Sequence, residues 1–324
     1  MLYYSTNHST FGSMKKVLVT NYVHDILIAG LREQNYEVIY DQDFDPEELD
    51  ELLPELTGVI INTKIKMTAE RIARGTKLEF IGRLGSGLDI IDLVAAKEQG
   101  VAVYNSPEGN RNAVAEHALG MLLCLANNIR RGDTEVREKI WNRELNRGFE
   151  LEGKTIGLIG FGNTGQALTS LLSSWTLEII YNDPYVLNLG KEFHTFENVT
   201  INELTSRADI LSLHVQLTDE THQLVDYDFL KKCRKGLILI NTSRGAVIDT
   251  QGLVTALEEG HVAGACLDVF HNEKPHRFST EDHQLFDRLY AMDNVILTPH
   301  VAGWTHESLR KIAKVLLAKI AGEH

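Results

Sequence analysis

Short apolar, mostly β-branched runs recur along the chain from Lys15, and stretches with helical spacing separate them. In the first 105 residues the apolar runs are 17–20, 37–40, 58–62, 79–84 and 101–105. The helical stretches between them are 24–33, 46–55, 68–75 and 89–98. Such alternation is typical of a parallel sheet with helices on both faces. The pattern therefore predicts a first α/β domain.

The same alternation returns later in the chain. An almost wholly apolar stretch at 113–131 predicts a helix buried between domains or between subunits. The polar stretch 132–150 contains Trp141 and Phe149 and suits either an arm lying on a neighbouring surface or ordinary surface structure. Further strands are predicted at 155–160, 178–183, 210–215, 237–243, 264–270 and 295–300, before a terminal amphipathic helix. Two doubly wound parallel-sheet domains fit a chain of 324 residues.

Composition narrows the classes of partner. A formal net charge of -13 argues against nucleic acid, and no apolar run approaches the roughly 20 residues that span a bilayer. Cys124, Cys233 and Cys266 are widely spaced in apolar segments, so we expect reduced thiols and a cytoplasmic protein. Residues 1–13 lack the features of an export signal, and we expect a tag or a disordered extension before a fold that begins near Met14.

A glycine-rich turn directly follows the predicted strand 155–160. Its residues are Gly160, Phe161, Gly162, Asn163, Thr164 and Gly165. In dinucleotide-binding folds such glycines permit the turn, the approach of a pyrophosphate and close helix–strand packing, and the helix N-terminus attracts the phosphates. Asp183 ends the next strand, where a carboxylate binds the ribose hydroxyls of NAD and repels the 2′-phosphate of NADP. The pattern therefore predicts an NAD site.

Three later strand ends carry polar residues with complementary chemistry. Arg244, Glu273 and His300 follow or end successive apolar runs, and the carboxyl ends of parallel strands open onto the ligand crevice. An imidazole can move the hydroxyl proton as hydride is transferred, and a carboxylate can orient its ring. A guanidinium can bind a substrate carboxylate while polarising the neighbouring oxygen. Each residue alone has an ordinary structural explanation, but together they predict chemistry at the second carbon of a small hydroxy acid.

Five motifs, in order, resemble the D-isomer-specific 2-hydroxyacid dehydrogenase family, especially its phosphoglycerate dehydrogenase-like branch. They are GRLGSGLDIID (82–92), NSPEGNRNAVAEHALGMLL (105–123), GKTIGLIGFGNTG (153–165), INTSRGAVID (240–249) and TPHVAGWT (298–305). The resemblance extends from about Met14 to the C-terminus. It implies an NAD-dependent enzyme that interconverts a D-2-hydroxy acid and its 2-keto acid, with Arg244, Glu273 and His300 as the catalytic trio.

The resemblance also implies an architecture. A Rossmann cofactor domain at 107–301 is inserted into a flavodoxin-like substrate domain formed by 14–106 and 302–324, with hinges near Ser106 and Ala302. Members of the family are usually homodimers joined through the cofactor domain, which would account for the apolar stretch and the arm.

Residues outside the trio receive implied roles as well. Backbone N–H groups around Leu84 and Gly85 are expected to bind the substrate carboxylate. Asp268 is expected to hold the nicotinamide carboxamide, and Thr242 with the Asn163–Thr164 backbone is expected to line the cofactor cleft.

The chain departs from the family pattern at two places. Gln216 stands where the family usually has proline, and Lys274 separates Glu273 from Pro275. The segment around Glu273 is also somewhat long, so the direction of Glu273 is less well defined than that of the other two residues. The spacing of His271, His276 and His283 in this segment suits no common metal-ligand pattern, and we expect a solvated loop without metal.

The substrate is the most open part of the prediction. The resemblance favours 3-phosphoglycerate and 3-phosphohydroxypyruvate, a step toward serine. The branch usually has an arginine near Asn62 that helps to hold the phosphate, whereas this chain has Lys64 and Lys66. Their ammonium groups either bind the phosphate as point charges or are simply solvated. Glyoxylate, hydroxypyruvate and branched 2-keto acids are alternatives. An NAD-sensing, corepressor-like binding protein is the alternative from a different functional class.

Overall fold

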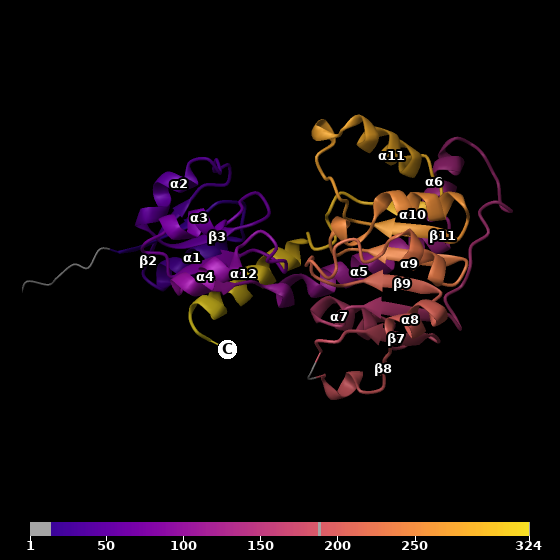
Figure 1. Ribbon diagram of the computed structural model, residues 1–324, viewed down its shortest axis with the longest axis horizontal. Coiled ribbons are helices and arrows are strands. Elements are labelled where there is room, and N and C mark those ends of the chain that lie inside the picture. The colour runs from indigo at the N-terminus through magenta and orange to yellow at the C-terminus, as the bar shows by residue number, and fades with distance from the viewer. Residues whose placement is uncertain (1–13, 187–188, 324) are drawn as a thin grey trace, which may run out of the picture. The chain divides into compact units, whose positions relative to one another are not determined.

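The chain folds into two compact units, each built on a parallel sheet. The computed structural model describes residues 14–186 and 189–323, and the predicted extension at 1–13 lies outside this range. Of the described residues, 14–109 and 309–323 form unit 1, and 110–186 and 189–308 form unit 2 (Figure 1). The predicted boundaries are 106/107 and 301/302. No helix in the described part of the chain is long and apolar enough to cross a membrane.

Unit 1 contains a five-stranded parallel sheet in the order β2-β1-β3-β4-β5. The strands are β1 (Lys15–Val19), β2 (Tyr36–Tyr40), β3 (Leu56–Ile61), β4 (Phe80–Arg83) and β5 (Ala102–Tyr104). The helices are α1 (Asp25–Glu33), α2 (Leu49–Leu52), α3 (Ala69–Arg74), α4 (Leu93–Gln99) and most of α12 (His306–Ile320). This strand order is that of flavodoxin-like folds, as predicted.

The end of the chain completes the core of unit 1. Ala313 and Leu316 of α12 are buried in one cluster with Val17, Val19 and Ile60 of the sheet. The C-terminal helix is therefore an integral part of the domain that the N-terminal strands begin.

Lys319 adds a polar connection at the far end of α12. Its Nζ donates to the Asn105 carbonyl at 3.0 Å and to the Glu108 carboxylate at 3.1 Å. The helix is thus fixed to the segment where the chain leaves unit 1.

Unit 2 contains a seven-stranded parallel sheet in the order β12-β11-β10-β9-β6-β7-β8. The strands are β6 (Thr155–Ile159), β7 (Glu178–Asn182), β8 (Glu197–Asn198), β9 (Ile210–Leu213), β10 (Leu237–Asn241), β11 (Val262–Leu267) and β12 (Val295–Leu297). The order runs outward from β6 in one direction and continues from β9 in the other, which is the Rossmann arrangement. Ligands bind such sheets at the carboxyl edge where the order reverses.

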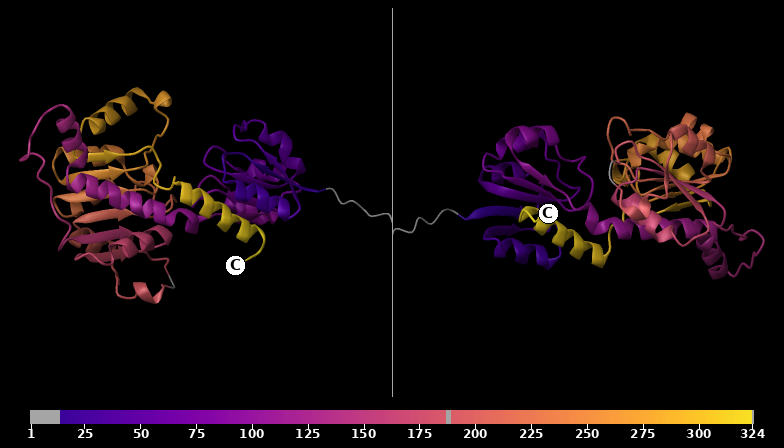
Figure 2. Two further views of the ribbon diagram at one scale, coloured as in Figure 1. Left: turned by 180° about the vertical axis from the view of Figure 1, so that it is seen from behind. Right: turned by 90° about the horizontal axis from the view of Figure 1, so that it is seen from below.

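Helices cover both faces of this sheet (Figures 1 and 2). On one face, α5 (Pro107–Ala126) and α7 (Asn163–Leu172) pack Leu122, Leu125 and Leu168 against Leu158 and Ile240. The other face is covered by α8 (Ile201–Arg207), α9 (Tyr227–Lys232), α10 (Thr250–Glu258) and α11 (Thr280–Tyr290). Successive residues of β10 therefore enter the two hydrophobic clusters in turn.

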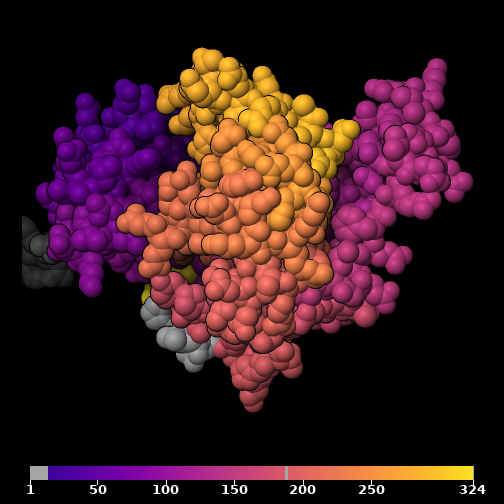
Figure 3. All heavy atoms as spheres, turned by 45° about the vertical axis from the view of Figure 1, so that its right-hand side comes forward, coloured from indigo at the N-terminus to yellow at the C-terminus, as the bar shows by residue number. Residues whose placement is uncertain are grey.

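The predicted helix at 113–131 has the wrong bounds. Helix α5 begins at Pro107, because proline suits the first turn of a helix, and it ends at Ala126. Asn128 adopts the left-handed conformation (φ 52°), which breaks the helix, and α6 (Ile129–Arg137) follows separately. The next segment, 138–150, lies on the projecting magenta part of unit 2 in Figure 3.

Candidate active site

The glycine turn lies where the strand order of unit 2 reverses. Gly160 has φ +91°, and a Cβ there would lie 2.6 Å from the His214 carbonyl oxygen, just after β9. A Cβ on Gly165 would lie 2.6 Å from the Gly160 carbonyl oxygen. No described atom lies within 4 Å of a Cβ built on Gly162. The first and third glycines are thus required by packing, while the second leaves the backbone open to a ligand.

The start of α7 offers backbone donors beside this turn. The helix begins at Asn163, and no side chain of Gly162, the N-cap residue, can satisfy the N–H groups of the first turn. The helix N-terminus carries partial positive charge, so the Asn163–Thr164 backbone suits a phosphate.

Asp183 follows β7 and contacts the same turn. Its Oδ2 accepts the Phe161 backbone N–H at 2.8 Å, while Oδ1 accepts the Tyr185 N–H at 2.9 Å and the Val186 N–H at 3.2 Å. The carboxylate therefore fixes the glycine turn to the end of β7. Its binding to a cofactor ribose stays a prediction.

Two unpartnered buried atoms lie on the following strand ends. Among the described residues, neither Thr242 Oγ1 nor His214 Nδ1 has a hydrogen-bond partner. A buried polar atom without a partner is costly, and it marks a place for a ligand or water. Thr242 was expected to line the cofactor cleft, and its orphan hydroxyl fits a dinucleotide. His214 was not predicted, although it ends an apolar run at the same sheet edge as the glycine turn.

The predicted trio follows three adjacent strands. Arg244 comes after β10, Glu273 after β11 and His300 after β12, and these strands are neighbours in the sheet. His300 Nδ1 lies 2.9 Å from Glu273 Oε2, and the two side chains are 38% and 39% exposed. The pair is therefore accessible to a small substrate. Because Nδ1 of His300 is bonded to Glu273, Nε2 is the ring atom that remains available to a substrate.

The charge state of Glu273 reflects these neighbours. Burial alone would raise the pKa of Glu273, but the hydrogen bond and charge of His300, the Phe270 N–H and the charge of Arg244 outweigh it. The pKa of Glu273 therefore lies below its ordinary value, and the residue is a carboxylate at neutral pH. The same interactions show that Arg244 and His300 act on one carboxylate.

Asp268 holds the segment that carries His300. Its carboxylate is 1% exposed and accepts the Thr298 hydroxyl at 2.6 Å, the Val301 N–H at 2.9 Å and the Ala302 N–H at 2.8 Å. His300, between these donors, adopts the left-handed conformation (φ 56°). These bonds define a positioning role that the sequence did not reveal. The expected bond from Asp268 to a nicotinamide carboxamide stays a prediction.

His117 extends this network to α5. Its Nε2 lies 2.9 Å from Thr298 Oγ1 and 3.7 Å from Asp268 Oδ1. Sequence reasoning missed His117 because nothing in an apolar helical stretch indicates which turn faces a buried carboxylate.

The predicted carboxylate-binding amides of unit 1 have internal partners. The Leu84 N–H donates to the Ile61 carbonyl at 2.9 Å, and the Gly85 N–H donates to Ser106 Oγ at 3.1 Å. Carboxylate binding by these amides would compete with those bonds, and it stays a prediction.

The strand order and the glycine turn define the class: unit 2 is a dinucleotide-binding α/β fold. Residues 119–302 match the family model described as "D-isomer specific 2-hydroxyacid dehydrogenase, NAD binding domain". The chain belongs to the D-isomer-specific 2-hydroxyacid dehydrogenase family, whose members are NAD-dependent enzymes that act on small 2-hydroxy and 2-keto acids.

Known relatives differ in the substrate that they are named for. The chain is 35% identical to the hydroxypyruvate reductase of Thermotoga maritima over 88% of its own length and 90% of that protein. It is also 35% identical to the D-3-phosphoglycerate dehydrogenase of Methanocaldococcus jannaschii, over 95% of this chain but only 57% of that protein. The solved D-lactate dehydrogenase of Aquifex aeolicus, complexed with NAD and lactic acid, matches with a TM-score of 0.81 and 27% identity, covering 95% of this chain and 96% of that one.

His214 predicts a pH dependence of stability. Burial lowers the pKa of His214 from 6.5 to about 4, although the residue as a whole is only half-buried by surface area. In the unfolded chain His214 is protonated below about pH 6.5, whereas in the folded chain it is protonated only below about pH 4. The free energy of unfolding therefore falls as the pH drops from 6.5 to 4. We expect His214 to account for a loss of about 2 kcal/mol between pH 7 and pH 5.

Urea unfolding of the wild type and a His214→Gln variant at both pH values measures this contribution. The variant should lose less unfolding free energy than the wild type on acidification. Equal losses in the two proteins would show that His214 takes up a proton normally in the folded state.

Proposed function

We propose that this chain interconverts a D-2-hydroxy acid and its 2-keto acid, with Arg244, Glu273 and His300 as the catalytic residues. The observation that supports this most directly is the 2.9 Å bond between His300 Nδ1 and Glu273, on strand ends adjacent to Arg244. The glycine turn, Asp183 and Thr242 would hold NAD, which would supply or accept the hydride. We propose NAD rather than NADP because an acidic side chain, Asp183, directly follows β7.

Each side chain of the trio has a distinct task in the reduction of a keto acid. The Arg244 guanidinium binds the substrate carboxylate and polarises the carbonyl oxygen at the second carbon. His300 Nε2 gives its proton to that oxygen as the carbon receives the hydride. Glu273 holds Nδ1–H and stabilises the imidazolium form before the transfer. In the oxidation direction His300 takes the hydroxyl proton back.

The substrate that we favour is the pair 3-phosphoglycerate and 3-phosphohydroxypyruvate. The motif resemblance and the named relative from Methanocaldococcus jannaschii support it. Lys64 and Lys66 are exposed on the loop after β3, where two ammonium groups can attract a phosphate. The hydroxypyruvate reductase relative, matched at equal identity, supports an unphosphorylated keto acid as the second candidate.

A substrate panel separates these candidates. We expect NADH absorbance to fall when 3-phosphohydroxypyruvate is added, with kcat/KM at least about tenfold above that for hydroxypyruvate, glyoxylate or a branched 2-keto acid. A preference for hydroxypyruvate or glyoxylate would replace our first candidate by the second. NADH binding without turnover of any keto acid would instead favour the corepressor-like alternative.

The proton carrier is tested by substitution. We expect His300→Ala to lower kcat by a factor of about 100 or more, because general acid catalysis contributes this much, while the Kd for NADH stays within about twofold. Stopped-flow turnover and NADH fluorescence titration measure the two quantities. A His300→Ala enzyme with a nearly normal rate would contradict the role of His300.

We further propose that the protein is a homodimer joined through unit 2. Large apolar side chains are exposed along one stretch: Ile129 (55%), Val136 (50%), Ile140 (46%), Trp141 (77%) and Leu145 (64%). An exposed apolar surface of this kind marks an interaction site. The part of unit 2 that carries them projects (Figure 3), which suits an arm that lies on a second copy.

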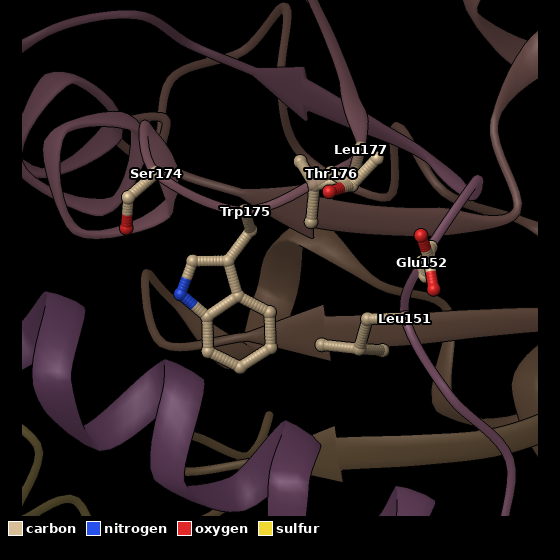
Figure 4. A pocket seen from close by; sticks show the side chains of 6 residues that line it. All are labelled: Leu151, Glu152, Ser174, Trp175, Thr176 and Leu177. Atoms are coloured by element: carbon tan, nitrogen blue, oxygen red, sulfur yellow. The ribbon is translucent and has the colours of Figure 1, made fainter.

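A pocket in the same unit offers a place for apolar side chains of the arm. It has a volume of about 350 Å³ and is lined by Leu151, Glu152, Ser174, Trp175, Thr176 and Leu177 (Figure 4). These residues precede β6 and β7, whereas the glycine turn and Asp183 follow them. The pocket therefore lies away from the cofactor site and is available to the partner.

Oligomeric state tests the dimer. We expect wild-type protein to sediment as a dimer at micromolar concentration and the Trp141→Glu/Leu145→Glu variant to sediment as a monomer, because buried charges destabilise an apolar interface. Val94→Glu is the matched control, since Val94 is 69% exposed in unit 1 and should leave the dimer intact. A monomeric wild type would exclude the dimer.

The cysteines support a cytoplasmic location. Cys124, Cys233 and Cys266 are all free thiols, and burial raises the pKa of Cys233 to about 12. Free thiols suit a reducing compartment, and we propose the cytoplasm.

A further inference from the structure

The loop that carries Glu273 lacks a rigid residue directly after the glutamate. Lys274 separates Glu273 from Pro275, and neither side chain of the Glu273–His300 pair is fully buried. Phe270 N–H donates to Glu273 Oε1 at 3.3 Å, which is a long bond. The aim of Glu273 must therefore depend on contacts made by its neighbours in the loop.

His271 makes three such contacts, two residues before Glu273. Its Nδ1 lies 2.9 Å from the Thr250 hydroxyl at the start of α10, and its Nε2 lies 3.0 Å from Asp282 Oδ1 in the first turn of α11. The ring stacks on Phe286, with centroids 5.0 Å apart and an interplanar angle of 13°. Phe286 is 1% exposed, so His271 is attached to the core of unit 2.

Asp282 joins a second residue of the loop to the same helix. Its Oδ2 accepts the Asn272 Nδ2–H at 3.0 Å and the Ser279 N–H at 3.2 Å. Ser279 in turn caps α11 by accepting the Asp282 N–H at 3.0 Å. One carboxylate thus anchors both His271 and Asn272 to the N-terminal end of α11, directly before Glu273.

The backbone at His271 also touches the loop of Arg244. A Cβ on Gly245 would clash with the Phe270 carbonyl group and the His271 nitrogen. The peptide that leads into the Glu273 loop is therefore packed against the residue that follows Arg244. A shift of His271 would displace Glu273 relative to both Arg244 and His300.

We propose that His271 is a positioning residue that fixes the direction of Glu273 through its bonds to Thr250 and Asp282. Both ring nitrogens are used in these bonds, so His271 acts through Glu273 and does not itself touch the substrate. A proline directly after the glutamate would restrict the conformation of the loop. In this chain the bonds of His271 to Thr250 and Asp282 restrict the loop instead, from the side that precedes Glu273. The proposal rests on the catalytic role of Glu273 proposed above.

Three variants separate the bonds from the ring contact. His271→Phe keeps an aromatic ring on Phe286 but removes both hydrogen bonds, and we expect kcat to fall about tenfold because misplacement of a catalytic group is costly. His271→Gln keeps an N–H donor for Asp282 and should retain most of the rate. His283→Phe is the control, because His283 lies on α11 beside Asp282 but its ring contacts Phe278 and not Phe286.

A double-mutant cycle with Glu273→Gln tests whether His271 acts through Glu273. We expect His271→Phe to lower kcat no further in the Glu273→Gln background, while KM for the keto acid and the Kd for NADH stay within about threefold. A merely structural role would give the same tenfold loss in both backgrounds. If His271→Phe does not fold, Asp282→Asn replaces it in the cycle, because this variant removes the carboxylate that binds His271 and Asn272.

The outcomes are distinguishable. A His271→Phe enzyme within twofold of the wild-type kcat, or a loss that adds fully to that of Glu273→Gln, would overturn the positioning role. A Glu273→Gln enzyme with wild-type kcat would instead overturn the proposed function of Glu273, and it is measured first.

Discussion

One buried carboxylate governs the geometry of the segment that carries His300. Asp268 is almost inaccessible to water, and an ionised group there is tolerable only if its oxygens are hydrogen-bonded. The three donors all come from the segment between Thr298 and Ala302. Satisfying Asp268 therefore bends that segment around the carboxylate and holds His300 in a left-handed conformation that a non-glycine residue rarely adopts. The position of His300 follows from the solvation requirement of a different residue.

Asp183, which is only half-buried, makes similar bonds on the other side of the strand-order reversal. Its carboxylate also accepts main-chain N–H groups, and one of them belongs to Phe161 in the glycine turn. Both acids thus use a charged side chain to shape backbone at the carboxyl edge of the sheet. The parallel strands bring the loops to this edge, and the carboxylates determine the conformations that the loops adopt there. The glycine turn and His300 are in this sense both held by carboxylates that accept main-chain N–H groups.

The alternation of apolar strands and helices predicted both sheets, because buried parallel strands are nearly continuous apolar runs. The exceptions were elements whose signals are local and weak: the two-residue strand β8, and the break at Asn128, which depends on a single backbone conformation. The positions of Arg244, Glu273 and His300 after predicted strands also identified them as candidates, since the loops after adjacent parallel strands lie at one edge of the sheet. It could not find His117, Thr298 or the bond from His271 to Asp282, because these contacts join segments 11 to 181 residues apart and leave no periodic trace.

The close packing of Gly245 on the peptide between Phe270 and His271 limits how this enzyme can change. Any side chain at that position would separate the loop of Arg244 from the loop of Glu273, whose charges interact with each other. A change of substrate cannot readily be achieved by substituting Gly245, because a larger residue there would also change the position of Glu273 relative to Arg244. New substrate preferences must therefore arise from loops that make no contact with this glycine, which leaves the reactive machinery constant while the recognition surface diverges.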